Sequence, residues 1–263
     1  MTSLFLAWQA PRQREWFPIG YLSADQARSH YVFQYTGGAV RAGKLVGFKP
    51  LPAFPNLRER YESPELFPLF KNRVLDSSRK DFPDYLRSLD LEPNSTDPIE
   101  ILAISGGERL TDSFEVFPKI VKGENNTFSC RFFLHGLRHA SKSAQSRGFE
   151  LQSRESLQVS FELNNPATGP AIQLTTSDYE FLGWAPRYLV SDILKSIAVS
   201  PEITANVVRV NEAGVPINRR VLVELSGRLP ANYEPMSGPD YRVISKAVRK
   251  THAVQRQKSG SAK

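Results

Sequence analysis

The sequence of 263 residues is 40% hydrophobic, so it can bury a substantial core, and its length predicts two domains. Aromatic residues make up 11% of the chain and prolines number 19, which favours strand-rich packing and excludes a protein built of long helices. A single cysteine excludes an intramolecular disulfide framework, and the net charge of +7 fits nucleic acid as a partner.

The expected location follows from the cysteine and from the N-terminus. Cys130 is the lone cysteine of the sequence, as is typical of a reducing compartment. The first residues show no basic run followed by an apolar stretch, so we expect no signal peptide. No run of about 18 apolar residues predicts a membrane span. The sequence therefore predicts a cytoplasmic protein that has no membrane partner.

The first part of the chain has the pattern of a small sheet. Residues 4–8, 16–22 and 31–35 are rich in aromatic and branched residues, and the last of these ranges alternates strictly, which predicts three strands. Gly37 and Gly38 are interpreted as the turn that follows the third strand.

Short helices and loops are expected next. Three prolines predict that residues 48–55 form an extended loop. Ser63 and Pro64 suit the N-cap and the first position of a short helix. Residues 81–89 predict a second short helix.

This first part resembles the N-terminal subdomain of HipA-type toxin kinases. The resemblance depends on Tyr31, Phe33 and Tyr35, on the proline-rich stretch, and on the Leu-Phe-Pro-x-Phe-x-Asn pattern over residues 66–72. It implies a small α+β domain over residues 1–92. Nothing later in the sequence matches a kinase core, because there is no glycine-rich loop followed by a lysine strand and no His-x-Asp or Asp-Phe-Gly pattern. Kinase activity is therefore not expected.

The second part begins after a polar, proline-bounded linker at residues 92–98. Apolar runs and alternation predict a series of strands in this part. The expected strands cover residues 99–104, 114–117, 128–134, 157–163, 171–174, 181–185, 206–210 and 221–225. Leu189, Ile193 and Ile197 recur at helical spacing and predict a helix over residues 187–197.

The sequence contains no catalytic constellation, so we expect no enzyme and no cofactor. Gly106 and Gly107 are interpreted as a turn, because no Gly-Lys-Ser/Thr follows as in a phosphate loop. His135 and His139 are four residues apart, but without a glutamate between them or a third ligand they are interpreted as polar surface residues. Cys130 has no activating base nearby and is expected to be a buried structural thiol.

A basic cluster lies in the middle of the second part. No acidic residue interrupts the stretch over residues 131–147. The stretch contains Arg131, His135, Arg138, His139, Lys142 and Arg147. Such a cluster either binds phosphates or forms a solvated loop, and composition alone leaves both interpretations open.

Four segments between residues 136 and 189 resemble the HIRAN domain. They are the turn Gly-Leu-Arg-His at residues 136–139, the loop with Glu162, Asn165 and Pro166, the strand Ala-Ile-Gln-Leu at residues 171–174, and Gly-Trp-Ala-Pro-Arg-Tyr-Leu at residues 183–189. Together they cover about 60 residues in the family's order. The resemblance implies an OB/SH3-like antiparallel β-barrel over residues 99–232, in a β-rich α+β protein. It also implies that this barrel grips the 3′ end of single-stranded DNA.

The resemblance also implies roles for individual residues. Arg138 would hold a backbone phosphate, His139 would stack on a base, and Asn164 or Asn165 would line the end pocket. The expected nucleic-acid-binding residues are Arg131, Arg138, His139, Lys142, Arg147, Asn164, Asn165 and Arg187. Ala167 and Thr168 stand where the family has Tyr and Asp, so DNA binding without end selectivity is expected, and a barrel repurposed for protein contacts is the alternative.

The excess positive charge belongs to the C-terminus. Residues 241–263 contain seven basic residues and no acidic ones, and the remainder of the chain is balanced. This composition predicts a disordered basic tail, which either attracts phosphates or only aids solubility.

Two hypotheses follow. The first is a non-enzymatic DNA-binding accessory protein of bacterial DNA repair or phage defence, with a helicase or nuclease as protein partner. The alternative is a protein-interaction module, an antitoxin-like or regulatory partner of a HipA-type kinase. No nucleophile–base or metal-ligand spacing favours a hydrolase.

Overall fold

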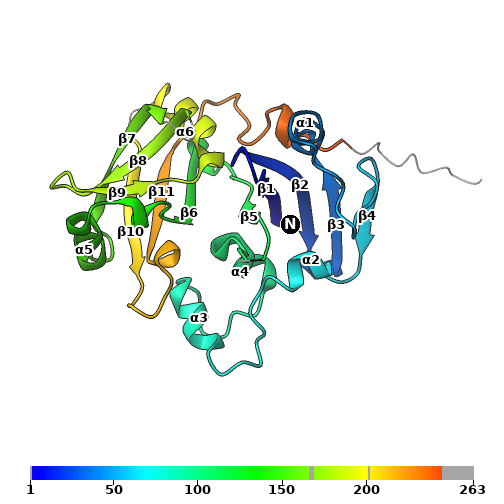
Figure 1. Cartoon of the computed structure of the whole chain (residues 1–263), viewed down its shortest axis with the longest axis horizontal. Coiled ribbons are helices and arrows are strands. Elements are labelled where there is room, and N and C mark those ends of the chain that lie inside the picture. Colours follow the sequence, from blue (N-terminus) through cyan, green and yellow to red (C-terminus); the bar gives the residue numbers. More distant parts are fainter. Residues whose placement is uncertain (1, 110, 166–168, 201, 245–263) are drawn as a thin grey trace, which may run out of the picture.

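The computed structural model describes residues 2–109, 111–165, 169–200 and 202–244. They form a strand-rich α+β protein with two antiparallel sheets side by side, surrounded by short helices (Figure 1). The predicted β-rich α+β class is confirmed. None of the helices in the described ranges is long and apolar enough to cross a membrane.

The first sheet has the strand order β4-β3-β2-β1-β5. Its strands are β1 (Thr2–Gln9), β2 (Trp16–Asp25), β3 (His30–Tyr35), β4 (Arg60–Ser63) and β5 (Phe114–Pro118). Both faces of β1 are buried: Leu4 and Leu6 pack into one core, while Phe5 and Ala7 pack into the core of the second sheet. The alternation of β1 therefore places the first sheet between two apolar layers.

The first sheet is completed from beyond the predicted linker. β5 pairs antiparallel with β1, with Phe117 opposite Phe5. The 114–117 strand was expected to belong to the second domain. The division of the chain between the two sheets therefore does not follow the linker at residues 92–98.

The expected strand over residues 99–104 is wrong, because this stretch forms helix α4 (Pro98–Ser105). Asp97 caps the helix by accepting a hydrogen bond from the backbone N–H of Ile99, and Pro98 occupies the first position. Gly106 ends the helix at φ +69°. The run looked like a strand because Ile99, Ile101 and Leu102 are buried and Ala103 and Ile104 are half-buried, so no exposed polar face marks the helical period.

The expected turn at Gly37 and Gly38 is also wrong. Helix α1 (Gly37–Val46) begins there and covers the first sheet (Figure 1). A Cβ on Gly37 would collide with the carbonyl oxygen of Pro239, and one on Gly38 with that of Pro18. These glycines allow the helix to approach the neighbouring backbone closely rather than bend the chain.

The remaining predictions for the first part have mixed outcomes. Ser63 does not cap a helix but ends β4, and helix α2 (Pro68–Lys71) starts four residues after Pro64. The predicted helix at residues 81–89 is confirmed as α3 (Phe82–Ser88). Residues 48–55 contain no helix or strand, as expected for the proline-rich loop.

The second sheet has the strand order β6-β11-β10-β7-β8-β9. Its elements are β6 (Thr127–Phe133), β7 (Ser156–Asn165), β8 (Gly169–Thr175), β9 (Phe181–Trp184), β10 (Thr204–Val210) and β11 (Val221–Arg228), with helices α5 (Lys142–Glu150) and α6 (Val190–Ile197) beside them. All six strands coincide with predicted ones, and the predicted helix over residues 187–197 is a 3₁₀ turn followed by α6. Helix α5 was not predicted, and Ser141 caps it.

The two edges of the second sheet meet at one point. His135 and Trp184 exchange two backbone hydrogen bonds, from His135 N to Trp184 O at 3.0 Å and from Trp184 N to His135 O at 2.8 Å. This isolated bridge joins β6 to β9 just beyond Phe133 without a continuous ladder. The described strands therefore form a curled sheet rather than a closed barrel.

The first residues of the predicted tail contact the first sheet. Tyr241 packs edge-on against Phe5, at 5.0 Å between ring centroids, and Val243 bridges to Thr36 beside the first sheet. Residues 245–263 lie outside the described part of the chain.

One buried ion pair stabilises the connection between α2 and β5. Arg73, with 1% of its side chain exposed, donates to both carboxylate oxygens of Asp112 at 2.6 and 3.2 Å and to the carbonyl oxygen of Gly107 at 2.9 Å. Its guanidinium also lies 5.2 Å from the ring centroid of Phe114. A fully buried guanidinium needs all of these partners, because desolvation of an unpaired charge is expensive.

Arg73→Ala is expected to lower the free energy of unfolding by about 3 kcal/mol, at the low end for a broken buried pair because Asp112 remains 24% exposed. Chemical denaturation measures this change. Arg79→Ala is the matched control, since Arg79 and Asp81 form a similar two-point pair with more than half of each side chain exposed. Equal losses in the two variants would contradict the proposed role of burial.

Candidate nucleic-acid interface

The turn after β6 presents Arg138 and His139 to solvent. Gly136 begins the turn at φ +83°, and a Cβ there would lie 2.5 Å from the indole of Trp184, so only glycine fits. Leu137 anchors the turn in the core of the second sheet. Arg138 Nε donates to His139 Nε2 at 3.0 Å, and both side chains are exposed.

A carboxylate at the end of β7 organises the neighbouring residues. Glu162 Oε2 accepts hydrogen bonds from Trp184 Nε1 at 2.8 Å, Asn165 Nδ2 at 2.9 Å and Gln173 Nε2 at 3.0 Å. These bonds, that from Asn165 foremost, lower the pKa of Glu162 and keep it ionised. The half-buried Trp184 also packs edge-on against Phe181, with ring centroids 4.7 Å apart.

Three separate pieces of sequence thus meet on one surface. The surface comprises Arg138, His139, Lys142, Asn165 and Trp184, and we call it the Trp184 surface. Lys142 is the exposed first residue of α5, directly after the turn. Within the described part of the chain, neither Arg138 nor Lys142 has a carboxylate partner.

The basic cluster predicted over residues 131–147 does not form one surface of unpaired cations. Arg131 lies on β6 and pairs with Glu224 at 3.0 Å and Asp90 at 3.2 Å. Arg147 lies on α5 and pairs with Glu155, and with Asp178 at 3.5 Å. These acids come from outside the stretch, so two of its four arginines and lysines are neutralised.

The other predicted residues have different surroundings. Asn164 is exposed on β7 next to Asn165, whereas Ala167 and Thr168 lie outside the described residues. Arg187 follows β9 and points toward the β1–β2 hairpin of the first sheet, where its Nη1 lies 3.4 Å from the carbonyl oxygen of Arg14. The sequence analysis did not anticipate that contact between the two sheets.

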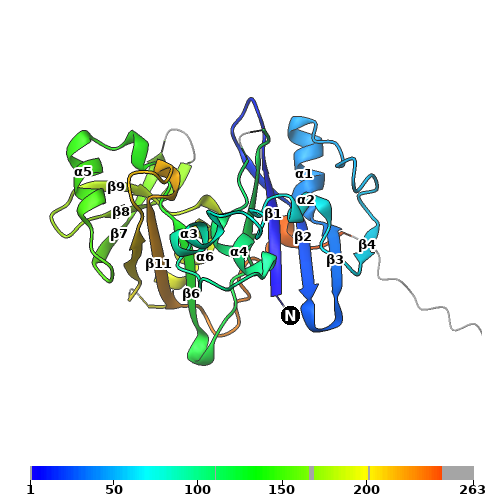
Figure 2. The ribbon, with the colours of Figure 1, turned by 90° about the horizontal axis from the view of Figure 1, so that it is seen from below.

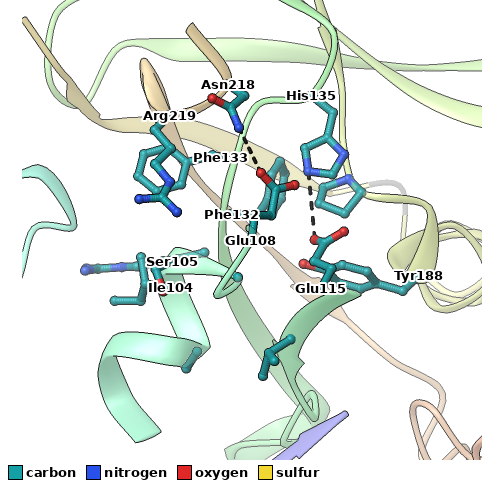
Figure 3. A pocket seen from close by; sticks show the side chains of 15 residues that line it. Ile104, Ser105, Glu108, Glu115, Phe132, Phe133, His135, Tyr188, Asn218 and Arg219 are labelled. Atoms are coloured by element: carbon teal, nitrogen blue, oxygen red, sulfur yellow. Dashed lines mark hydrogen bonds and ion pairs between the residues drawn. The ribbon is translucent and has the colours of Figure 1, made fainter. Parts of the chain in front are cut away.

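A small cavity lies between the two sheets (Figure 3). His135, whose backbone pairs with Trp184, is part of its lining. The volume of the cavity is about 40 Å³, which is enough for water molecules but not for an organic substrate. Glu115 on β5 points toward His135, with Oε1 4.0 Å from Nε2. Glu108 enters from the loop after α4 and accepts a hydrogen bond from Asn218 Nδ2 at 2.8 Å.

The cavity changes the ionisation of the groups that face it. Burial raises the pKa of Glu115 to about 8, and the negative charge of Glu108 adds to this shift. Although 39% of the His135 side chain is exposed, desolvation lowers its pKa; the charge of Glu108 opposes this shift and that of Arg187 supports it. Both groups are therefore neutral at pH 7, and no ion pair forms across the 4.0 Å separation.

Sequence analysis missed this pair. The signal was available in Phe-Glu-Val-Phe at residues 114–117, where Glu115 interrupts an apolar strand. His135, interpreted as a polar surface residue, faces Glu115, while His139 stays exposed. No group of three metal-ligating side chains occurs in the described ranges. Cys130 is buried as predicted, and burial raises the pKa of its thiol to about 12.

The comparisons with known proteins establish no relationship. No family model matches the sequence, and no curated protein matches it. A crystal structure of a protein from Lactobacillus plantarum is similar over 41% of this chain and 93% of its own, with 14% sequence identity and a TM-score of 0.32. A likeness this low shows neither a family nor a function.

Glu115→Gln is expected to stabilise the protein more at pH 8 than at pH 5. The pKa of Glu115 is raised from 4.5 to about 8 in the fold, so the unfolded chain loses this proton first and stability falls between these values as pH rises. The amide keeps the shape of the side chain and cannot ionise. Urea unfolding at both pH values measures the effect, and Glu124→Gln at an exposed position is the control. A difference between wild type and Glu115→Gln that does not grow with pH would contradict the buried neutral carboxyl.

Proposed function

We propose that this protein is a non-enzymatic DNA-binding accessory protein that contacts single-stranded DNA through the Trp184 surface. The observation that supports this most directly is that Asn165 and Trp184 both donate to the Glu162 carboxylate, while Gly136, two positions before Arg138, lies against the indole of Trp184. These are the segments on which the HIRAN resemblance depends. The proposal interprets the curled second sheet as an OB/SH3-like fold that is not fully closed, and adds a role beside a helicase or nuclease in DNA repair or phage defence.

The chemistry of the surface suits a nucleic-acid strand. Arg138 and Lys142 are exposed cations without a carboxylate partner in the described part of the chain, and phosphates are their natural ligands. The faces of Trp184 and His139 provide stacking for bases, which contributes about 1–3 kcal/mol per base.

The Trp184 surface contacts a strand without selecting its end. Ala167 and Thr168 offer neither the aromatic face nor the carboxylate that would recognise a 3′ hydroxyl. Binding therefore depends on phosphate charge and stacking, and both are present along the whole length of a strand.

Arg138→Ala is expected to weaken binding of single-stranded DNA about tenfold and to reduce the salt dependence of log K by about 0.7, the value for one phosphate contact. Fluorescence anisotropy over a salt series measures both quantities. Arg131→Ala is the matched control on the adjacent strand, because its charge is already neutralised by Glu224 and Asp90.

Unchanged affinity in Arg138→Ala, or equal losses in the two variants, would overturn the Trp184 surface as the binding site. Comparison of 3′-tailed, 5′-tailed and duplex DNA tests the expected lack of end selectivity. Absence of binding to every DNA form would favour the protein-interaction alternative.

A further inference from the structure

Arg187 of the second sheet contacts the turn between β1 and β2, which carries two further arginines. Arg12 and Arg14 occupy the exposed turn between β1 and β2, where Arg14 has φ +58°. Arg187 comes from the second sheet and donates to the carbonyl oxygen of Arg14 at 3.4 Å. We call Arg12, Arg14 and Arg187 the hairpin arginines.

The hairpin arginines have no carboxylate partner among the described residues. The nearest acid, Glu15, is engaged with Arg41 at 2.6 Å, and Arg41 also contacts Asp240 at 2.8 Å. The Arg187 guanidinium is partly buried, so its pKa is lowered by desolvation and further by the charge of Arg14, while the charge of Glu15 opposes this shift. Partial burial of a cation beside another cation is unfavourable unless an anion occupies the site.

Several arginines of the protein are neutralised by carboxylates. Arg41, Arg73, Arg131 and Arg147 each reach at least one carboxylate within 4 Å. Arg187 instead donates to a backbone carbonyl, as Arg220 and Arg242 also do. Arg187 differs from those two in its place, where the two sheets meet and where the charge of Arg14 lies beside it.

The position of the cluster fits the path of a strand. Arg187 lies three positions after Trp184, which limits their Cα separation to about 11 Å. Stacked nucleotides rise about 3.4 Å each, so a few nucleotides cover this distance. Figure 2 shows the β1–β2 hairpin projecting from the first sheet on the same side of the molecule as α5.

We propose that Arg12, Arg14 and Arg187 form a second phosphate-binding site, which holds the backbone of the same DNA strand beyond the Trp184 surface. This inference rests on the proposed function for the identity of the ligand. It adds the first sheet to the interface and gives the protein a footprint longer than the second sheet alone. The strand then runs across the junction of the two sheets.

The test distinguishes phosphate binding by the hairpin arginines from a purely structural role of the β1–β2 hairpin. Arg12→Ala/Arg14→Ala removes two charges but keeps the backbone carbonyl that Arg187 contacts. Arg58→Ala/Lys80→Ala is the charge-matched control, since both residues are exposed and have no ion-pair partner in the described ranges. Thermal unfolding verifies that both double variants remain folded.

Anisotropy with oligothymidines of about two nucleotides, too short to reach from Trp184 to Arg187, and of about twelve nucleotides distinguishes the two sites. We expect Arg12→Ala/Arg14→Ala to weaken binding of the longer strand about tenfold and to lower its salt slope by about 1.4, without changing the shorter one. Arg138→Ala is expected to weaken both.

The other outcomes are decisive as well. If the hairpin variant behaves like its charge-matched control while Arg138→Ala weakens both strands, the second site is wrong and the proposed function stands. If Arg138→Ala has no effect and the hairpin variant weakens binding, the hairpin site stands and the Trp184 surface is wrong. If no variant differs from wild type, both proposals fail.

Discussion

The stack of Phe117 on Tyr188 is the contact on which the arrangement of the two sheets depends. The rings lie 3.9 Å apart between centroids and 5° from parallel, with Phe117 on β5 and Tyr188 in the turn after β9. Phe5 lies 5.7 Å from Phe117 and extends the contact into β1. Such a pair contributes about 0.5–1.5 kcal/mol beyond the area that it buries. Because Arg187 is the adjacent residue, the stack also determines where its guanidinium lies.

Packing at this junction is incomplete on one side of the stack. Phe5 contacts Tyr21 and Tyr241 on the other side of the stack, whereas Glu115 and His135 face the small cavity next to Tyr188. A carboxyl without a hydrogen-bond donor in such a place favours its neutral form, which makes the junction sensitive to pH rather than to salt. His135 connects this region to the Trp184 surface, because its backbone forms the bridge to Trp184.

The sequence predicted the second sheet well and the first part of the chain less well, for physical reasons. Alternation and β-branched residues mark the six strands of the second sheet, and their apolar faces form one core. Helices α1 and α4 were missed or misassigned because their signals serve tertiary contacts. Gly37 and Gly38 permit close approach rather than a turn, and α4 is buried on several sides, so its helical period is hidden. Neither contact is visible from local sequence.

The free basic residues of the surface could not be predicted from local sequence either. The stretch over residues 131–147 contains no acid, yet Arg131 and Arg147 are neutralised by acids that lie elsewhere in the sequence. Arg14 and Arg187, 173 positions apart, meet without a carboxylate between them. Residues 1–240 carry equal numbers of acidic and basic residues. A cationic surface therefore forms only where the fold pairs the acids with some arginines and lysines and leaves others unpaired. Free arginines in this protein are therefore a property of the fold, and a local run of basic residues is a poor guide to the surface that meets an anion.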